Sequence, residues 1–254
     1  MILAIIQARM SSTRLPNKVL KPIMGKPMLA LQLSRIKQSQ LIDNIVVATS
    51  KQGDDDAIES LCKTQQVECF RGDLNDVLAR FYHTSQAYSP DHIVRLTADC
   101  PLTDAKVIDR VISTHLTQQA DYTSNCQPAT FPDGLDVEVF TAKALTISYQ
   151  QAQKPSEREH VTQFMRNHSE LFTLANYQYH QDLSHHRWTV DETKDFEFVT
   201  QVYQYLYADN PYFTMQDILA LLARKPQLSQ INQNISRDEG LLKSLQQDKE
   251  QGYE

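Results

Sequence analysis

The sequence predicts an α/β fold in which a mostly parallel sheet carries helices on both faces. Over residues 1–119, short apolar runs alternate with longer amphipathic segments, as they do in successive βαβ units. The runs themselves, such as MILAII at 1–6, are apolar throughout, which is typical of parallel strands buried on both sides. We therefore expect a three-layer, Rossmann-like α/β/α arrangement.

The elements of the first half follow from apolar content and helix signals. The segment at 27–38 starts with Pro27, a favoured first helical residue, and continues with apolar residues at helical spacing. The segment at 54–66 opens with three acids, which suit the positive end of a helix dipole. Asp73 or Asn75 can cap the next helix. Strands are expected at 1–6, 44–49, 67–70 and 92–97, and helices at 27–38, 54–66, 75–88 and 104–119.

The second half is less regular. Its expected strands are 136–140 and 171–177, and its expected helices are 141–152, 157–168 and 193–207. Residues 225–254 are polar and predict a peripheral helix and a frayed tail. Because no Gly/Ser-rich linker interrupts the chain, we expect one domain over 1–254, with a substrate-facing insertion at about 125–180 that could also reach a partner.

Composition excludes several classes of protein. The net charge of −6 argues against a general nucleic-acid-binding surface. No stretch approaches the roughly 20 apolar residues of a membrane helix, and the N-terminus lacks a signal-peptide pattern. The four cysteines form no C-x-x-C pair, so free thiols are expected rather than a zinc site. We expect a cytoplasmic protein that binds neither nucleic acid nor membranes.

The loop after the first strand, within IIQARMSSTRLPNK, is unusually cationic for an acidic chain. Arg9, Arg14 and Lys18 fall within ten residues, with hydroxyl side chains such as Ser12 between them. Ligands of open parallel sheets bind beyond the carboxyl ends of the strands, where this loop begins. Guanidinium groups, ammonium groups and backbone N–H groups all suit phosphate oxygens, so the loop predicts a polyphosphate site. It matches neither the Walker nor the G-x-G-x-x-G pattern, and a merely solvated basic loop is the alternative.

Two distant aspartates are candidates for a metal site. Asp99 follows the strand expected at 92–97, and Asp191 precedes the helix expected at 193–207. Mg²⁺ prefers carboxylate oxygens and retains waters, as a triphosphate site requires. The ordinary alternatives are that Asp99 caps a turn before Pro101 and that Asp191 caps the following helix.

The chain resembles the sugar-activating cytidylyltransferases, and it is most similar to the spore-coat polysaccharide biosynthesis protein F (SpsF-like) group. The 3-deoxy-manno-octulosonate and acylneuraminate cytidylyltransferases share the A-R-x-x-S-x-R-x-P-x-K pattern after strand one. Six segments carry the resemblance in order over residues 3–199: IIQARMSSTRLPNKVL, FRGDLNDVLARFY, VRLTADCPLTD, FPDGLDVEVF, SEREHVTQF and HRWTVDETKDFEFV.

This resemblance implies a nucleotidyltransferase fold and assigns roles to residues. It makes Lys18, Arg9, Arg14 and Asp99 catalytic, and it makes Asp99 and Asp191 ligands of Mg²⁺ (or Mn²⁺). The nucleotide-binding residues would be Gln7, Ala8, Arg9, Ser12, Arg14, Lys18, Thr49, Ser50, Arg71, Asp76, Arg80 and Thr97. For Asp76 and Arg80, an i,i+4 ion pair on a helix surface is the alternative.

The resemblance also implies an acceptor pocket in the second half. Its residues would be Asp133, Gly134, Asp136, Arg158, Glu159 and His160. Arg158 would clamp a sugar carboxylate with its planar fork. His160 would donate to a hydroxyl group, and the alternative for it is a buried histidine with ordinary partners.

The implied reaction is transfer of CMP from CTP to a sugar, with release of pyrophosphate, for surface polysaccharide or glycan biosynthesis. An acidic sugar such as a nonulosonate or octulosonate is the expected acceptor, and a homodimer the expected assembly. Three alternatives stay open: another NTP with a sugar phosphate, a GT-A type glycosyltransferase, and a non-catalytic nucleotide-binding protein. A D-x-D motif, typical of the glycosyltransferases, is missing at Asp99, since Cys100 and Pro101 follow it.

Overall fold

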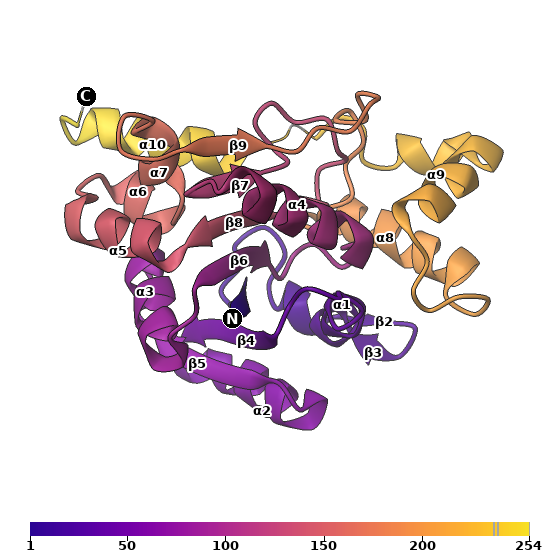
Figure 1. The fold of residues 1–254 in the computed structure, drawn as a ribbon. Helices are drawn as coiled ribbons and strands as arrows, with labels where there is room; N and C mark the ends of the chain where they lie inside the picture. Colours follow the sequence, from indigo (N-terminus) through magenta and orange to yellow (C-terminus); the bar gives the residue numbers. More distant parts are fainter. Residues whose placement is uncertain (236, 238, 254) are drawn as a thin grey trace.

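A seven-stranded, mostly parallel sheet forms the centre of the protein (Figure 1). The computed structural model describes residues 1–253 except 236 and 238. In spatial order the strands are β5 (Glu68–Gly72), β4 (Asn44–Ser50), β1 (Ile2–Gln7), β6 (His92–Thr97), β8 (Glu138–Thr141), β7 (Tyr122–Ser124) and β9 (Leu174–Asn176). Only β8 runs antiparallel to its neighbours, so the predicted sheet is confirmed. A small ribbon pairs β2 (Pro22–Ile23) with β3 (Lys26–Pro27).

Helices cover both faces of the sheet, as its apolar strands require. They are α1 (Met28–Ile36), α2 (Asp56–Gln65), α3 (Val77–Tyr88), α4 (Ala105–Gln118), α5 (Ala142–Gln151), α6 (Pro155–Glu159), α7 (Gln163–Asn167), α8 (Thr193–Leu206), α9 (Met215–Arg224) and α10 (Glu239–Glu250). Three short 3₁₀ helices are η1 (Lys18–Leu20), η2 (Gly53–Asp55) and η3 (Pro226–Gln230).

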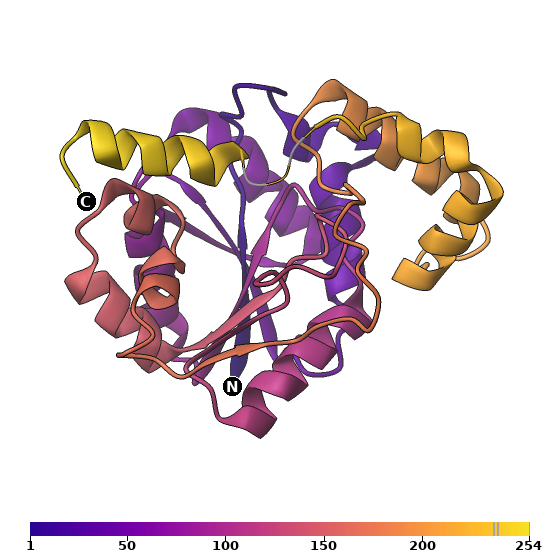
Figure 2. The ribbon, with the colours of Figure 1, turned by 90° about the horizontal axis from the view of Figure 1, so that it is seen from above.

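The side chains of β1 alternate between two separate cores. Ala4 and Ile6 belong to the core shared with α1, α2, α4, α8 and α9, whereas Leu3 and Ile5 belong to the core under α3, α5 and α7. This period of two is the normal alternation of a strand. It produces the three-layer α/β/α arrangement that the sequence predicts, and Figures 1 and 2 show it from two directions.

Expected and observed elements agree closely in the first half and less well in the second. Every element expected before residue 120 is present, with its ends within two residues. The single helix expected at 157–168 is wrong, because Val161 has a φ of 57° and separates α6 from α7. The strand expected at 171–177 shortens to β9, and β7 and α9 were not expected.

Within 225–254, the expected peripheral helix is confirmed as α10, whereas the expected frayed tail is wrong for most of the described residues. Helix α10 lies beside α6, where Ser244 Oγ donates to Glu159 Oε2 at 2.9 Å and the Ser156 N–H donates to Asp248 Oδ1 at 3.1 Å. Asn232 is buried. The polar tail therefore packs onto the rest of the chain. Within the described residues, no helix is long and apolar enough to cross a membrane.

Candidate active site

The carboxyl ends of β1 and β6 open into a cavity of about 180 Å³. The cationic loop after β1 forms one wall, so the sequence correctly predicts where this loop lies. The lining residues are Gln7, Ala8, Arg9, Ser12, Thr13, Arg14, Lys18, Val19, Thr97, Ala98, Asp99 and Asp191. Both candidate metal ligands and most of the expected nucleotide-binding residues are thus brought together.

Lys18 joins the two aspartates at the base of this cavity. Its Nζ lies 3.2 Å from Asp99 Oδ2, 2.9 Å from Asp191 Oδ1 and 2.8 Å from the carbonyl oxygen of Val190. Burial lowers the pKa of Lys18, but the two carboxylates outweigh burial and the net effect raises it. A charged ammonium therefore holds together two carboxylates that are far apart in sequence.

Asp99 is ionised at neutral pH. Burial favours its neutral form, but Lys18 and the Thr97 hydroxyl, which donates at 2.5 Å, bring its pKa down to about 2. The expectation that Asp191 caps the next helix is wrong. Glu192 is the N-cap residue of α8, and it forms a capping box with Asp195.

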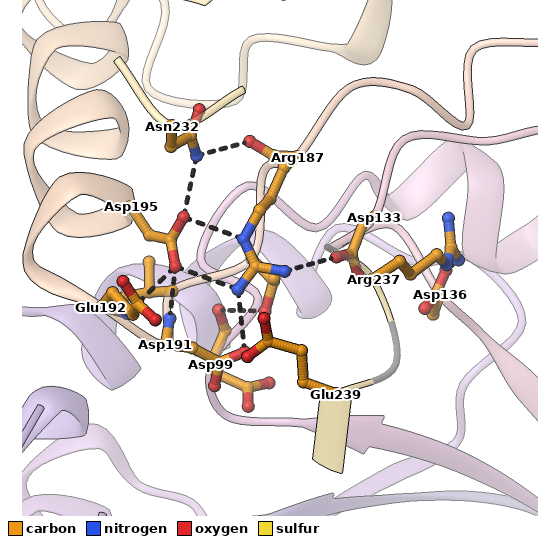
Figure 3. A network of polar contacts seen from close by, with 12 residues as sticks. Asp99, Asp133, Asp136, Arg187, Asp191, Glu192, Asp195, Asn232, Arg237 and Glu239 are labelled. Carbon is orange, nitrogen blue, oxygen red and sulfur yellow. Dashed lines mark hydrogen bonds and ion pairs between the residues drawn. The ribbon is translucent and has the colours of Figure 1, made fainter. Parts of the chain in front are cut away.

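A buried arginine fixes the position of Asp191 (Figure 3). Arg187 donates to the Asp195 carboxylate from Nε at 3.0 Å and from Nη2 at 3.1 Å. The same Nη2 also donates to Asp191, and Nη1 donates to Asp133, each at 3.0 Å. Asp195 also accepts the backbone N–H of Asp191 at 3.0 Å. Asn232, from the C-terminal segment, donates to Asp195 at 2.9 Å and to the carbonyl of Arg187.

Sequence reasoning missed Arg187, Asp195 and Asn232. The spacing of four between Arg187, Asp191 and Asp195 is a signal that could have indicated the first two. Because Arg187 and Asp195 are almost completely buried, their role is to orient Asp191 rather than to meet solvent.

A second cleft of about 310 Å³ continues from the first cavity. The two share Gln7, Arg9, Arg14, Thr97, Asp99 and Asp191. Four residues expected to bind sugar line this cleft, namely Asp133, Asp136, Glu159 and His160. Burial and the nearby Asp136 carboxylate raise the pKa of Asp133 to about 7. Residues 239–241 close the other side, where Glu239 pairs with Arg14 at 2.9 Å.

Two residues expected in the acceptor pocket lie outside this lining. Arg158 forms a fork onto Asp76 Oδ2, with distances of 2.8 and 2.5 Å. Gly134 has a φ of 107°, and an added Cβ would lie 2.5 Å from the backbone nitrogen of Thr189. The structure therefore gives Arg158 an ion-pair role and Gly134 a steric one. The alternative of a surface ion pair between Asp76 and Arg80 is wrong, since Asp76 pairs with Arg158 and caps α3.

The remaining expected nucleotide-binding residues lie at the carboxyl ends of β4 and β5. Thr49 and Ser50 are fully buried, and Arg71 pairs with Asp56 and Glu59. Arg80 is buried, and its Nε and Nη2 find no partner among the described residues. Burial and the nearby Arg9 lower its pKa to about 10. None of these residues is part of the lining of the first cavity.

Comparison with known proteins identifies the family. Residues 3–213 match the family model described as cytidylyltransferase. The chain belongs to the cytidylyltransferase family. It is 37% identical over 232 residues to the spore coat polysaccharide biosynthesis protein SpsF of Bacillus subtilis, covering 89% of this chain and 95% of that one. It is 35% identical over 117 residues to a 3-deoxy-manno-octulosonate cytidylyltransferase of Polynucleobacter necessarius, covering 44% of each.

A solved structure supports the same assignment. The cytidylyltransferase from Leptospira borgpetersenii superposes with a TM-score of 0.86 at 33% identity, covering 93% of this chain and 98% of that one. The resemblance seen in the sequence motifs is confirmed, and so is the nucleotidyltransferase fold. This cytidylyltransferase is a CTP-dependent nucleotidyltransferase.

Proposed function

We propose that this cytidylyltransferase transfers CMP from CTP to an acidic sugar and releases pyrophosphate. One observation carries the proposal: Lys18 holds Asp99 and Asp191 in a cavity that also contains Arg9 and Arg14. Cations and carboxylates are thus both available where a metal–triphosphate would bind. The similarity to a polysaccharide biosynthesis protein supports a role in glycan production.

The cations of the first loop neutralise the triphosphate and orient it for attack. Arg9 and Arg14 bind its terminal phosphates through their planar forks. Lys18 stabilises the charge that develops as the bond to the leaving pyrophosphate breaks. Asp55 accepts the Met10 N–H at 2.7 Å and so fixes this loop to the adjacent turn before the reaction begins.

The two aspartates fit a divalent cation. Their carboxylates converge on one ammonium, and Mg²⁺ typically takes one or two carboxylates, substrate phosphates and waters. Since no group of three or more His, Cys, Asp or Glu side chains that could hold a metal occurs among the described residues, these two aspartates would be the protein ligands and phosphates and waters would supply the rest. Asp99 and Asp191 would hold Mg²⁺ (or Mn²⁺), which supplies further neutralisation of the α-phosphate.

The acceptor occupies the second cleft, beside Asp191. An oxygen of the sugar attacks the α-phosphorus and forms the new P–O bond while the bond to pyrophosphate breaks. The proton of the attacking hydroxyl passes to the Asp191 carboxylate, which Arg187 and the backbone bonds to Asp195 hold in place. Asp133 and Asp136 accept hydrogen bonds from the other hydroxyl groups of the sugar.

Pyrophosphate release tests this function. We would cross the four common NTPs with acidic sugars, sugar phosphates and neutral sugars, with Mg²⁺ present. Release with CTP and an acidic sugar, lost in Lys18→Ala and Asp99→Ala, is the expected result. Release with another NTP would overturn the base assignment but keep the mechanism. Turnover of an existing nucleotide sugar without pyrophosphate would indicate a glycosyltransferase.

A further inference from the structure

A third cavity, of about 170 Å³, extends the cleft away from the triphosphate loop. It shares Arg95, Thr97, Asp136, His160 and Leu241 with the second cleft, so the two are continuous. Its remaining lining residues are Cys126, Gln127, Glu138, Thr162, Arg166 and Arg237. None of the cations in this cavity was singled out from the sequence.

The charges of this third cavity do not cancel. Arg95 pairs with Glu138, and Arg237 pairs with Asp136 at 2.5 Å. Arg166 is different, because its Nε donates to the neutral amide oxygen of Gln127 at 2.7 Å. Among the residues that the structure describes, no carboxylate pairs with Arg166.

The Glu138 carboxylate already accepts hydrogen bonds from other side chains. Besides Arg95, it accepts the Tyr122 hydroxyl and the Thr162 hydroxyl, each at 2.6 Å. Burial lowers the pKa of His160, so this ring adds no positive charge at neutral pH. The third cavity therefore keeps one unbalanced guanidinium, that of Arg166. A positive charge in a confined cavity favours an anionic ligand.

The hydrogen bond to Gln127 orients the guanidinium of Arg166 through Nε and leaves Nη1 and Nη2 available to a ligand. Gln127, its partner, is fixed in turn through its backbone N–H, which donates to Asn176 Oδ1 at 3.3 Å. Asn176 donates to the carbonyl of Pro128 at 3.0 Å. A pre-oriented fork is the arrangement that binds a carboxylate or phosphate with two bonds.

We propose that Arg166 binds an anionic group of the acceptor, a carboxylate or a phosphate that is not the attacking group, and that Arg237 and Leu241 complete this subsite. The inference rests on the proposed function and names where the acid group of the sugar lies. Arg237 and Leu241 lie beyond the residues 3–213 that the family model matches. The choice among acidic sugars is thus made partly by the C-terminal segment. Arg158, bound to Asp76, does not take this role.

The test compares four proteins: the wild type, Arg166→Gln, Arg166→Lys and the control Arg224→Gln. Arg224 lies on α9, is exposed and bonds only to a carbonyl of its own helix. Acceptors are 3-deoxy-manno-octulosonate, sialic acid, their methyl esters and sugar phosphates. We expect Arg166→Gln to lower kcat/KM for the charged acceptor about 10- to 100-fold, while KM for CTP changes less than twofold. Arg166→Lys, which keeps the positive charge, should retain a higher kcat/KM for the charged acceptor than Arg166→Gln.

The esters separate charge from shape. In the wild type the acid should be preferred over its ester, and Arg166→Gln should lose that preference. Sugar phosphates distinguish a phosphate from a carboxylate as the recognised group. Equal kinetics of Arg166→Gln and wild type with an acidic acceptor would overturn the subsite and leave the proposed function intact. A preference for neutral acceptors would overturn both the subsite and the acidic acceptor of the proposed function.

A binding measurement keeps the inference testable if no sugar yields pyrophosphate. That result would refute the proposed function, and calorimetric titration of each acidic sugar into the CMP-saturated protein would then decide the subsite. Binding by wild type that is lost in Arg166→Gln supports it. Equal binding by both proteins, or binding by neither, overturns it. Matching melting temperatures of the variants establish that they fold.

Discussion

Lys18 shows how one side chain can assemble a site from distant parts of a chain. Its ammonium contacts Asp99 and Asp191, which follow different elements, and without it the two carboxylates would repel each other. The ammonium is kept in a buried position because two carboxylates face it at 3.2 and 2.9 Å. Structure and chemistry therefore depend on the same three groups.

Replacing Lys18 by alanine should lower kcat/KM for CTP about 10²- to 10³-fold, because the leaving phosphate loses its main neutralising group. The measurement is steady-state pyrophosphate release at saturating acceptor. Lys63→Ala is a suitable control, because its side chain is 74% exposed and pairs only with Glu59 on the same helix. A loss of less than threefold in Lys18→Ala would contradict the assigned role.

Glu138 predicts a dependence of stability on pH. Burial raises its pKa, but Arg95 outweighs burial, so its pKa in the folded protein lies below the ordinary value. A lowered acid pKa stabilises the fold above the unfolded pKa of about 4.5, and this stabilisation is lost as the pH falls through the folded pKa.

Glu138→Gln should therefore cost about 3–5 kcal/mol of unfolding free energy at pH 7, since it leaves Arg95, whose side chain is only 15% exposed, without its carboxylate. The difference in unfolding free energy between Glu138→Gln and the wild type should become smaller as the pH falls from 5 to 3. Urea unfolding at each pH measures it, with the exposed Glu197→Gln as control. A gap that stays constant with pH would contradict the lowered pKa.

At the scale of elements, the site depends on a close crossing between the loop before β8 and the segment before α8. The Asp133 N–H donates to the His186 carbonyl at 2.9 Å, and the Trp188 N–H donates to the Asp133 carbonyl at 2.6 Å. Gly134 lies at this crossing with a φ of 107°. The crossing brings Asp133 to Arg187 and so determines the shape of the acceptor cleft.

Gly134→Ala should lower the free energy of unfolding by about 3 kcal/mol, because it combines backbone strain with overlap against fixed backbone atoms. Gly53→Ala is the matched control, since its Cβ would meet nothing within 4 Å. Denaturant unfolding measures both. Equal stability of the two variants would show that the segments can separate without cost.

The sequence predicts a helix or strand well where the element is long and its apolar residues repeat with a clear period. Buried strands such as β1 and amphipathic helices such as α4 carry many residues that repeat one pattern. The three-residue strand β7 is too short to show a period. The break between α6 and α7 depends on the left-handed backbone of Val161, which tertiary packing imposes on a residue that disfavours it.

Site residues could likewise be predicted only where the sequence carries a local pattern. Clustered residues, such as the cations of the first loop, could be found because neighbours in sequence stay neighbours in space. Arg95 and Arg166 are single arginines on separate elements, and nothing local distinguishes them from surface residues. Arg158 has a motif but contacts Asp76, a partner 82 residues away that only the fold could reveal.

At the scale of the whole molecule, a net charge of −6 coexists with a first cavity lined by three cations, Arg9, Arg14 and Lys18, and two carboxylates. These positive groups lie at the carboxyl edge of the sheet. Their attraction for an anionic substrate acts against the repulsion from the negatively charged remainder of the surface. The homodimer and the cytoplasmic location stay predictions, as does the assignment of residues 1–254 to one domain. The bonds from Asn232 and α10 to the main sheet region favour that single domain.

Calorimetry with CTP tests the single domain and the nucleotide site together. Because η3, Asn232 and α10 pack against the elements of the site, unfolding should give one cooperative transition rather than two. CTP with Mg²⁺ at about 100 times its Kd should add about 2.7 kcal/mol, or roughly 5–10 °C in Tm for a chain of this length. Lys18→Ala should lose most of that rise, and Lys63→Ala should keep it. Two separate transitions, with only one shifted by CTP, would show that the C-terminal region unfolds independently of the nucleotide site.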